Sequence, residues 1–410
     1  MSEVVEMNIS DAIDNKIDKS KWVKCKFSDL TDNIVEKVVP KYSGLKHYIG
    51  LEHLDTESLK IRRFGETSSL IGDKLKIYKG DLIFAKRNAY LKRVAIAEFE
   101  AVASAHSMVL RPKSKNVNPD FLPFFLMSEG FWKRAIEISV GSLSPTINWK
   151  TLAKQEFLLP PKEQQAQLAE LLWAMDEVIE RERKVLENCE ALRDINREKL
   201  FTYGISALKD EDVDTKNGNS GKIPTTWDER RFSEIVTITS GQVDPKKEEF
   251  KNLFQIGSER IEPNTGKITE FKTAHELGIT SGNYLFSEEH IIYSKIRPYF
   301  KKVANPNITG LCSADIYPLL PDRNLISKEF LFYYLLTEKF TKTMLQFQNR
   351  TGMPKVNRDE LGVMYIPLPE ANEQAHIVEI LKEIDCSRDS ILFKISSSKA
   401  LQRSLINQIF

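Results

Sequence analysis

The chain has 410 residues, of which 41% are hydrophobic and 29% are charged, and its formal net charge is only +1. A chain of this length is too long for one hydrophobic core and predicts two or more. No apolar run reaches the roughly 18 residues that a membrane-spanning helix needs, and the start MSEVVEMNISDAID is too polar for a signal peptide. We therefore expect a cytoplasmic protein without a membrane partner.

The first half of the chain is predicted to form a mixed globular part that one long helix follows. Strand-like alternation in DLIFAKR, at 81–87, ends in two cations, and SMVLRP, at 107–112, continues the strand character. The segment PDFLPFFLMSEGFWKRAIEI, at 119–138, has aromatic residues at helical spacing and predicts one helix. EFLLPP, at 156–161, predicts a closing strand that ends at proline.

A long helix is expected after the closing strand of each half, because the hydrophobic period changes to steps of three and four residues without glycine or proline. Neither helix can bury such a stripe alone, so we predict that the two pair in an antiparallel coiled coil. The alternative is that each helix packs on its own globular part. The predicted seam consists of Leu168, Leu171, Met175, Val178, Val185 and Leu192 in the first helix, and Ile377, Ile380, Ile384, Ile391, Ile395 and Leu401 in the second.

The second half of the chain repeats the first at one constant offset. KRNAYLKRVA, at Lys86–Ala95, matches KIRPYFKKVA, at Lys295–Ala304. QAQLAELLWAMD, at Gln165–Asp176, matches QAHIVEILKEID, at Gln374–Asp385. The order of elements is also the same, from HIIYSKIR through SKEFLFYYLLTEKFTKTMLQF to YIPLPE. A repeat of about 200 residues is too long for a solenoid and predicts duplicated domains related by a pseudo-twofold axis.

These elements predict an α+β fold in which two pseudo-symmetric mixed α/β domains are joined by the two long helices. We place the first domain at 1–161 and its helix at 162–208, and the second domain at 223–369 and its helix at 370–410. Residues 209–222 are charged and rich in glycine, asparagine and serine, so we predict a linker that lets the second copy reverse direction.

The sequence lacks the residues of several common catalytic centres. It has no GxxxxGK[ST] loop for ATP, and neither a glycine-rich cofactor loop nor an Asn-Pro-Pro-Tyr-like tetrapeptide for methyl transfer to an amine. The six histidines are not grouped as a metal site, and the four cysteines lack the spacing of a zinc site or of a disulfide framework. We therefore predict that this chain binds no metal or cofactor and is not an enzyme.

The combined motifs resemble the specificity subunit of Type I restriction-modification systems over nearly the whole chain. They comprise Pro160, Glu163-Gln164, Leu168 and Leu172 in the first half, Ile223-Pro224-x-x-Trp227 between the halves, and Pro369, Glu373-Gln374, Ile377 and Leu381 in the second half. The resemblance implies two target recognition domains, each of which reads one half of a bipartite sequence in double-stranded DNA. It also implies a coiled coil that sets the spacer and docks two methyltransferase subunits, which two restriction subunits join for cleavage. S-adenosylmethionine, ATP and Mg are then expected in these partners rather than in this chain.

The repeated segment of cations and tyrosines is the candidate DNA-binding surface. Cations neutralise phosphates, an arginine bridges guanine O6 and N7, and a tyrosine stacks on a base. Lysines common to both copies suit phosphate contacts, because the two halves must read different bases. Base contacts are expected where the copies diverge, which nominates Arg62, Arg63 and Arg260. The repeated candidates are Lys86, Arg87, Tyr90, Lys92 and Arg93 in the first copy, and Lys295, Arg297, Tyr299, Lys301 and Lys302 in the second.

Two other interpretations stay open from the sequence. If the tyrosines only pack a turn and the lysines form a solvated face, the chain is a coiled-coil scaffold that holds protein partners without reading bases. The chain is alternatively the specificity subunit of a related combined nuclease–methyltransferase system. A basic face on both globular parts would favour DNA binding, and an evenly mixed surface would favour the scaffold.

Overall fold

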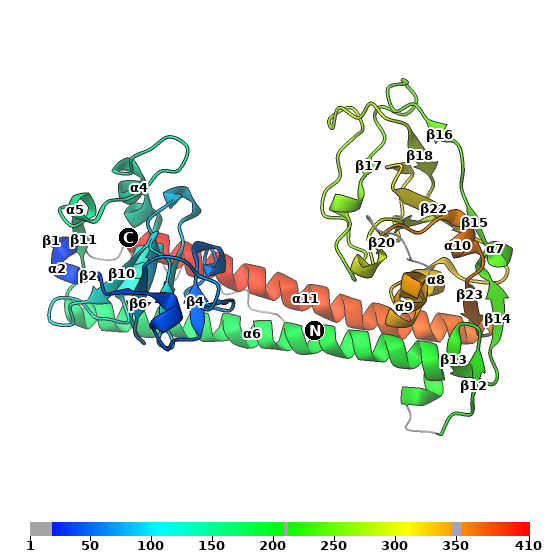
Figure 1. Cartoon of the computed structure of the whole chain (residues 1–410), viewed down its shortest axis with the longest axis horizontal. Helices are drawn as coiled ribbons and strands as arrows, with labels where there is room; N and C mark the ends of the chain where they lie inside the picture. Colours follow the sequence, from blue (N-terminus) through cyan, green and yellow to red (C-terminus); the bar gives the residue numbers. More distant parts are fainter. Residues whose placement is uncertain (1–18, 209–211, 347–353) are drawn as a thin grey trace, which may run out of the picture. The chain divides into compact units, whose positions relative to one another are not determined.

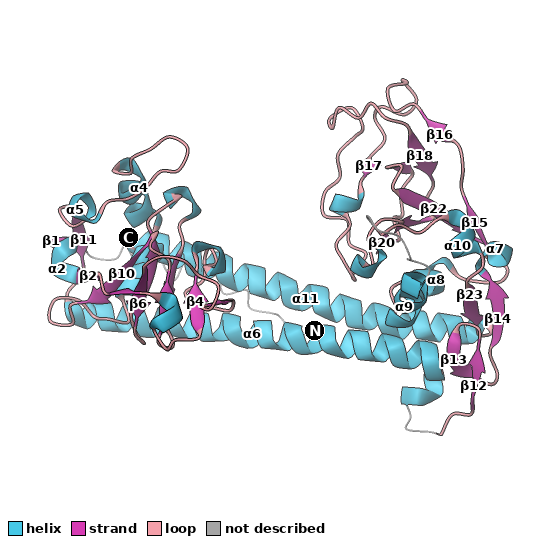
Figure 2. Ribbon diagram, in the orientation of Figure 1, coloured by secondary structure: helices cyan, strands magenta, loops and turns pink. Residues whose placement is uncertain are grey.

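The chain divides into two compact units, which are drawn in Figures 1 and 2. The computed structural model describes residues 19–208, 212–346 and 354–410. Unit 1 comprises Met1–Lys184 with Leu392–Phe410, and unit 2 comprises Val185–Ile391. The division runs through both long helices, so each unit contains one end of each of them. Both units are α+β, and Figure 2 shows short strands that long loops connect.

The strands of unit 1 form a two-stranded sheet in the order β1-β11, a four-stranded sheet in the order β2-β10-β7-β8, and a five-stranded sheet in the order β3-β6-β9-β4-β5. β4 and β9 pair in parallel, and the other pairs are antiparallel. The strands are β1 (Val23–Lys26), β2 (Thr31–Ile34), β3 (Lys37–Val38), β4 (His47–Ile49), β5 (Gly65–Glu66), β6 (Lys74–Ile77), β7 (Leu82–Ala85), β8 (Val94–Ile96), β9 (Ala101–Ala103), β10 (Ser107–Pro112) and β11 (Glu156–Leu159).

Strand β7 is apolar at every position because both of its faces are buried. Successive side chains of a strand point to opposite faces. Leu82 and Phe84 belong to one hydrophobic core of unit 1, and Ile83 and Ala85 belong to another. Both faces of the four-stranded sheet are therefore buried at this strand, which the run LIFA allows.

The helix predicted at 119–138 is broken into two. Ser128 is extended, and its hydroxyl accepts a hydrogen bond from the backbone N of Phe131 (3.2 Å), so it ends one helix and caps the next. The helices of unit 1 before the long one are α2 (Phe27–Leu30), α3 (Leu122–Met127), α4 (Glu129–Glu137) and α5 (Trp149–Leu152), with 3-10 turns η1 (Pro40–Tyr42), η2 (Leu51–His53) and η3 (Ala89–Leu91).

Unit 2 repeats this plan with small differences. Its sheets have the orders β12-β13, β14-β23, β15-β22-β19-β20 and β16-β18-β21-β17. β17 and β21 pair in parallel, as β4 and β9 do in unit 1. The strands are β12 (Thr215–Gly218), β13 (Gly221–Pro224), β14 (Asp228–Arg231), β15 (Val236–Ile238), β16 (Gln242–Val243), β17 (Gln255–Ile256), β18 (Asn283–Phe286), β19 (Ile291–Ser294), β20 (Val303–Ala304), β21 (Gly310–Cys312), β22 (Ile316–Pro321) and β23 (Tyr365–Leu368).

The region predicted as a linker contains the hairpin of β12 and β13. Its turn reaches Gly221, which has a φ of +95° that glycine adopts without strain. Glu229 accepts hydrogen bonds from the backbone N of Asn219 (2.8 Å) and of Ser220 (2.6 Å), which holds the turn. The polar composition of 212–222 therefore reflects a tight turn as well as a connection.

In the second half of the chain, the helix predicted for SKEFLFYYLLTEKFTKTMLQF is also broken, at the position that matches Ser128. Thr337 accepts a hydrogen bond from the backbone N of Phe340 (3.1 Å) and separates the two helices. The helices of unit 2 are α7 (Phe232–Ile235), α8 (Lys328–Leu335), α9 (Glu338–Gln346) and α10 (Arg358–Gly362), with 3-10 turns η4 (Ile205–Leu208), η5 (Ser258–Arg260) and η6 (Pro298–Phe300).

The two long helices are α6 (Lys162–Tyr203) and α11 (Ala371–Ile409), and in each unit their segments pack antiparallel (Figure 1). In unit 1 the Gln402 side chain donates to the carbonyl of Leu172 (3.3 Å). In unit 2 the Arg388 guanidinium pairs with Glu190 (3.0 Å). The ends of the helices complete the cores, because Ile406 and Ile409 join that of unit 1, and Leu200 and Phe201 join that of unit 2.

The buried seam of α6 differs from the predicted one. Ala169, Leu172 and Ile179 are buried, and so are the polar residues Gln165, Asp176, Arg193 and Arg197 at the same spacing. This row is shifted by one position from the predicted row. A prediction based on apolar residues alone does not include its polar members. The predicted positions Leu171, Val178, Val185 and Leu192 are 47–57% exposed, whereas Leu168 and Met175 pack against the core of unit 1.

The predicted seam of α11 agrees with the structure in part. Ile377 and Ile395 are buried, and Ile380 packs against the core of unit 2. Ile384 and Ile391 are half-buried, and Leu401 is exposed. The buried row of α11 also contains Gln374, Arg388 and Gln402.

A buried glutamine joins the start of each long helix to its recognition domain. In unit 1 the Gln165 amide donates to the carbonyl of Pro160 (2.8 Å), and its oxygen accepts from the backbone N of Asn118 (2.8 Å). In unit 2 Gln374 makes the same two bonds, to Pro369 (3.0 Å) and from Ser327 (2.8 Å). The repeated glutamine of the helix motif is therefore a structural joint.

Candidate nucleic-acid interface

The repeated segment of cations and tyrosines forms the same strained turn in both units. In unit 1, η3 lies between Asn88 (φ 55°) and Lys92 (φ 48°), and both residues are left-handed. In unit 2, η6 lies between Arg297 (φ 49°) and Lys301 (φ 48°). A residue other than glycine is uncommon in this region of φ and ψ. Two such residues at matching positions in both copies indicate a turn whose shape is important.

The tips of the two turns present an aromatic ring to solvent. Tyr90 is 56% exposed, and Tyr299 is 45% exposed. Phe300 is also exposed, and its ring centroid lies 4.7 Å from that of Tyr299. Arg87 and Arg297 are exposed at the start of the turns. These rings and guanidinium groups are placed to stack on bases or to bind phosphates.

The lysines that end the two turns have partners within their own units. Lys92 pairs with Glu129, the first residue of α4, and Lys301 pairs with Glu338, the first residue of α9. Lys301 is only 8% exposed. The two ion pairs join the turn to a neighbouring helix, so a structural role accounts for the repetition that had suggested phosphate contacts.

The remaining lysines and arginines of the segment differ in accessibility. Burial lowers the pKa of Lys86 and of Lys295, and Lys295 donates to the carbonyl of Ala314. Arg93 donates to the carbonyl of Leu51 (2.6 Å), and Lys302 donates to that of Ser258 (2.6 Å). These three bonded groups support neighbouring loops.

The arginines nominated as base readers are all ion-paired. Arg62 binds Glu180 of α6 and the hydroxyl of Ser58 (2.8 Å), and Arg63 binds Asp55. In unit 2, Arg260 binds Glu270 (3.3 Å), Glu259 (3.2 Å) and the side-chain oxygen of Gln255 (3.0 Å). Arg62 thus connects its loop to a long helix.

Positive charge gathers near the turns through residues that the sequence analysis did not select. In unit 1 the pKa of His106 is lowered by burial and by the nearby cations Arg87, Lys86 and Lys74. In unit 2 the pKa of Lys295 is lowered by burial and then by Lys355 and, to a smaller extent, by Arg358. No pattern marked Lys74, whereas Lys355 and Arg358 belong to the segment NRTGMPKVNRDE, which is polar and basic in sequence.

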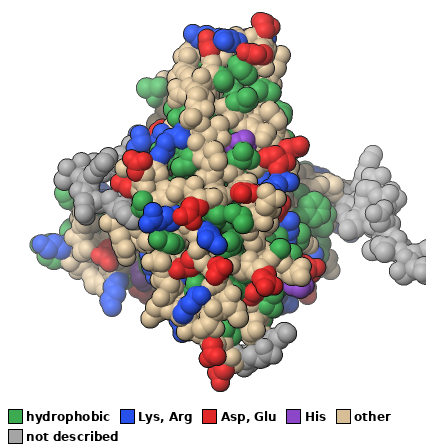
Figure 3. Space-filling view, turned by 90° about the vertical axis from the view of Figure 1, so that its right-hand side faces the viewer, with side chains coloured by type: hydrophobic (Ala, Val, Ile, Leu, Met, Phe, Trp, Pro, Cys, Tyr) green, Lys and Arg blue, Asp and Glu red, His purple; other side chains and the backbone are tan. Residues whose placement is uncertain are grey.

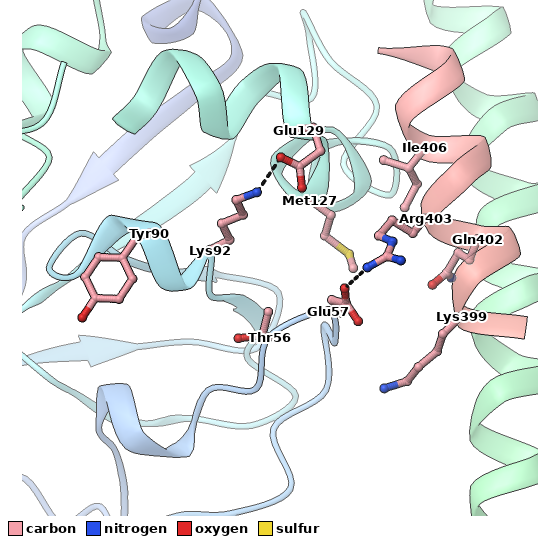
Figure 4. A pocket seen from close by; sticks show the side chains of 10 residues that line it. All are labelled: Thr56, Glu57, Tyr90, Lys92, Met127, Glu129, Lys399, Gln402, Arg403 and Ile406. Carbon is pink, nitrogen blue, oxygen red and sulfur yellow. Dashed lines mark hydrogen bonds and ion pairs between the residues drawn. The ribbon is translucent and has the colours of Figure 1, made fainter. Parts of the chain in front are cut away.

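A pocket of about 300 Å³ lies beside the turn of unit 1, as Figure 4 shows. Lys92 and Glu129 line one part of it. Glu57 accepts a hydrogen bond from Arg403 of α11 (2.7 Å) in another part. Lys399 extends from the same helix toward the pocket (Figure 4). The C-terminal part of α11 therefore lines the same pocket as the turn of unit 1.

In unit 2 a loop is also bound to a long helix, but through different side chains. Asn264 has a left-handed φ of 63°, as Glu57 has at 60°. The side chain of Asn264 accepts from Arg197 of α6 (2.7 Å) and donates to Asp194 (3.1 Å). In each unit a loop of the recognition domain is thus bound to the long helix that follows the other domain in sequence.

Surface charge is mixed on the face drawn in Figure 3. Lysine and arginine side chains alternate there with aspartate and glutamate rather than forming one basic area. Within residues 19–208, 212–346 and 354–410, no group of three or more histidine, cysteine or acidic side chains is arranged to hold a metal ion. Across these same ranges, no helix has the length and apolarity to cross a membrane.

The chain thus consists of a duplicated α+β unit, with an exposed aromatic and cationic turn in each copy, and of two long helices that pair in each unit. The family model described as "Type I restriction modification DNA specificity domain" matches residues 37–191 and again residues 224–395. These two matches span well over half of the sequence, so the chain belongs to this family.

Curated relatives and solved structures agree with the family model. The chain is similar to the Type I restriction enzyme EcoDI specificity subunit of Escherichia coli, with 28% identity over 72% of this chain and 68% of that protein. It is 24% identical to the MjaVIII specificity subunit of Methanocaldococcus jannaschii, over 81% of this chain and 79% of that protein.

Two solved structures show the same fold. A chain from a study of complex assembly and conformational transition of the type I R-M system has a TM-score of 0.58 at 18% identity, and covers 94% of this chain and 97% of its own. The S subunit of the Type I system from M. genitalium has a TM-score of 0.52 at 17% identity, and covers 95% and 96%.

This chain is accordingly the DNA specificity subunit of a Type I restriction-modification system and has two recognition domains. The specificity subunit of such systems is not catalytic, and its family carries no cofactor. Family membership decides against a scaffold that does not read DNA and against a different class of restriction system.

Proposed function

We propose that each unit reads one half of a bipartite target in double-stranded DNA, and that α6 and α11 set the spacer between the halves. The observation that carries this proposal is the duplication of the turn with Tyr90 and with Tyr299, around which the neighbouring side chains differ. A repeated turn with different side chains around it suits two domains that bind DNA in the same orientation but read different bases.

Tyr90 and Arg87 in unit 1, and Tyr299 and Arg297 in unit 2, are the contacts that exposure supports most directly. Lys86 adds a half-buried cation near the first turn. The other residues nominated from the sequence stay predictions, and the ion pairs or hydrogen bonds of their side chains must open before they reach DNA. We expect the complex to act in the cytoplasm, together with the DNA that it marks.

We further propose that the exposed row of α6 docks the methyltransferase subunits. Leu171, Val178, Val185 and Leu192 recur every seven residues and are all about half exposed. An apolar row with this period is the surface that a partner helix covers in a coiled coil. The pseudo-symmetry of the chain suits two methyltransferase subunits and, for cleavage, two restriction subunits.

Substituting glutamate at Val178 and Val185 tests the docking surface. The double variant is expected to lose co-purification with the methyltransferase while it keeps its fold, because the side chains are exposed and a charge there opposes helix packing. Lys184→Glu, at an exposed position outside the row, is the matched control and should keep the complex. Retention of the methyltransferase by the double variant would contradict this docking surface.

The spacer proposal is tested by lengthening both helices together. Seven residues inserted after Lys184 in α6 and seven after Ile391 in α11 preserve the helix faces and add about 10 Å. We expect the gap between the half-sites to grow by about three base pairs at a rise of 3.4 Å. Both half-site sequences should remain the same.

Long-read sequencing of methylated adenine in cells that carry the variant gives the result directly. A seven-residue insertion between Asp212 and Val213, outside both helices, is the control and should leave the gap unchanged. New half-sites with the original gap would show that the helices contribute to base reading and do not set the distance.

A further inference from the structure

A small cavity of unit 1 lies where β7, β10 and the start of α5 meet. It has a volume of about 210 Å³ and is walled in part by Leu75, Met108 and Trp149. Lys37 and Lys86 also line it, and none of its lining residues, all of which lie in the described chain, is acidic. The cavity therefore has an apolar floor and a positive charge.

The cavity contains a buried hydroxyl without a hydrogen-bond partner. Ser107 is only 1% exposed, and within the described residues its Oγ has no partner. Buried polar atoms are almost always bonded, because an unsatisfied one loses its bonds to water without replacement. Ser107 follows the strand register of β10 opposite Ala85, next to Lys86. A ligand that accepts a hydrogen bond here would satisfy this hydroxyl.

Two more polar groups of the cavity are available. Burial lowers the pKa of Lys86, and none of the described residues that line the cavity is a carboxylate, so an anion at its ammonium group would be stabilised. Asn148 begins α5 without a side-chain capping bond. Its counterpart Asn357 uses the side-chain oxygen to cap α10, accepting from the backbone N of Glu360 (2.8 Å).

The corresponding place in unit 2 is filled by the chain itself. Arg358, at the position of Trp149, stacks 5.0 Å from the ring of Tyr317 and 5.8 Å from that of Tyr284. Its guanidinium donates to the carbonyls of Ile238 (2.8 Å) and Thr239 (2.9 Å). A cation of the chain is thus inserted where unit 1 is open.

The polar groups of the cavity also have altered counterparts in unit 2. Ile316 replaces Ser107, so no hydroxyl is left unsatisfied there. Lys295 occupies the position that matches Lys86, but its ammonium group already donates a hydrogen bond to the carbonyl of Ala314. The features that favour an anion therefore occur together in unit 1 and are absent together from this place in unit 2, among the described residues.

We propose that the cavity of unit 1 is a phosphate-binding site, in which Lys86, Ser107 and Asn148 hold the phosphate oxygens. Its volume admits one phosphate group and a few waters, since a water molecule takes about 30 Å³. The phosphate comes either from the backbone of bound DNA, in which case the inference rests on the proposed function, or from free inorganic phosphate.

The test uses the full chain and two variants that act by different means. Lys86→Met removes the cation, and Ser107→Ile introduces the residue of unit 2 and blocks the cavity without a change of charge. Lys115→Met removes an exposed lysine of unit 1 outside the cavity and is the matched control. Circular dichroism and the thermal midpoint establish that each variant is folded.

Two measurements distinguish the sources of phosphate. Calorimetry with inorganic phosphate should show binding that both cavity variants weaken roughly tenfold or more, as expected for a lost charged hydrogen bond, and that Lys115→Met leaves unchanged. Fluorescence anisotropy with a duplex of arbitrary sequence at several KCl concentrations measures phosphate contacts to DNA. If the cavity holds a backbone phosphate, the slope of log affinity against log salt falls by about 0.9 in both cavity variants.

The outcomes separate clearly. Weakened phosphate binding with a reduced slope supports the DNA backbone as the source, and weakened phosphate binding with an unchanged slope supports free phosphate. No phosphate binding by the wild type, or equal binding by all four proteins, would overturn the site. Neither measurement depends on sequence selection, so a failure of the proposed half-site reading would be seen only in the methylation pattern.

Discussion

Units 1 and 2 share one backbone plan but fill the seam between α6 and α11 with different chemistry. In unit 1 the buried seam includes Ile179, Gln402 and Ile406. At the matching positions of unit 2 the buried residues are Arg388, Arg193 and Arg197. One copy is therefore largely apolar at positions where the other buries three guanidinium groups. The duplication preserves the helix geometry while the buried side chains of the two seams differ.

The charged seam of unit 2 contains a local network of ion pairs. Arg388 pairs with Glu190 (3.0 Å), and Arg197 pairs with Asp194 (3.0 Å). Burial lowers the pKa of Arg197 and raises that of Asp385, which shows that both groups lose favourable hydration. Buried ion pairs contribute little net stability, since desolvation offsets their attraction. We infer that this network favours the correct pairing of segments rather than stability.

The largest expected effect concerns the aromatic residue that ends each long helix. Phe201 is fully buried in unit 2, where its ring centroid lies 4.9 Å from Phe330. Its counterpart Phe410 packs 5.2 Å from Phe121 but is only half-buried. Phe201→Ala should lower the free energy of unfolding of unit 2 by about 3–5 kcal/mol. Phe410→Ala should cost unit 1 clearly less.

Hydrogen exchange monitored by mass spectrometry measures the two units separately, because it reports the stability of each segment. Exposed Phe393→Ala, on α11, is the control and should change neither unit. Equal losses in the two units would show that the end of α11 is as important to unit 1 as the end of α6 is to unit 2.

A smaller and symmetric effect is expected from the buried glutamines. Gln165→Leu and Gln374→Leu each remove the two matching hydrogen bonds to the backbone and leave a carbonyl and an N–H unsatisfied, and Gln374→Leu also removes a third bond, to the carbonyl of Leu325 (3.0 Å). Each change should therefore destabilise its own unit by roughly 2 kcal/mol. Urea unfolding followed by unit-specific exchange provides the values. A large difference between the two variants would show that the matched geometry does not carry matched energy.

A further expected effect is the dependence on pH that Lys339 gives to unit 2. Burial, only partly opposed by Glu229 and Glu198, lowers the pKa of Lys339 to about 8. Unit 1 has Gly130 at the matching position. Because the folded pKa lies below the unfolded value of about 10.4, the unfolded state binds more protons between these two values. The stability of unit 2 should then rise from about pH 8 to about pH 10.4.

Lys339→Met removes this contribution, so the difference between wild type and variant should grow in favour of the wild type over that range. Exchange or urea unfolding at pH 7, 8, 9 and 10 follows the difference, in which the other titrating groups cancel. A difference that stays constant with pH would mean that Lys339 is protonated alike in the folded and unfolded chain.

The sequence by itself determined the duplication, the family and the positions of the two long helices. These features depend on local periods and on matches such as Lys86–Ala95 with Lys295–Ala304, which need no knowledge of contacts. The break of each short helix pair was also encoded locally, because Ser128 and Thr337 are good helix caps, although the aromatic pattern concealed it.

Only the tertiary structure decided which helix face is buried and which cations are free. The seam shifted by one position because buried polar residues find local partners: Arg193 lies 3.9 Å from Asp385 of α11, and Arg197 pairs with Asp194 of its own helix (3.0 Å). A hydrophobic pattern counts such residues as exposed. Likewise, Lys92 pairs with Glu129, which is distant in sequence, so the sequence does not show that this cation has a partner. The physical reason is the same in both cases: the cost of burying a charge depends on its neighbours in space, and the order of residues along the chain does not specify them.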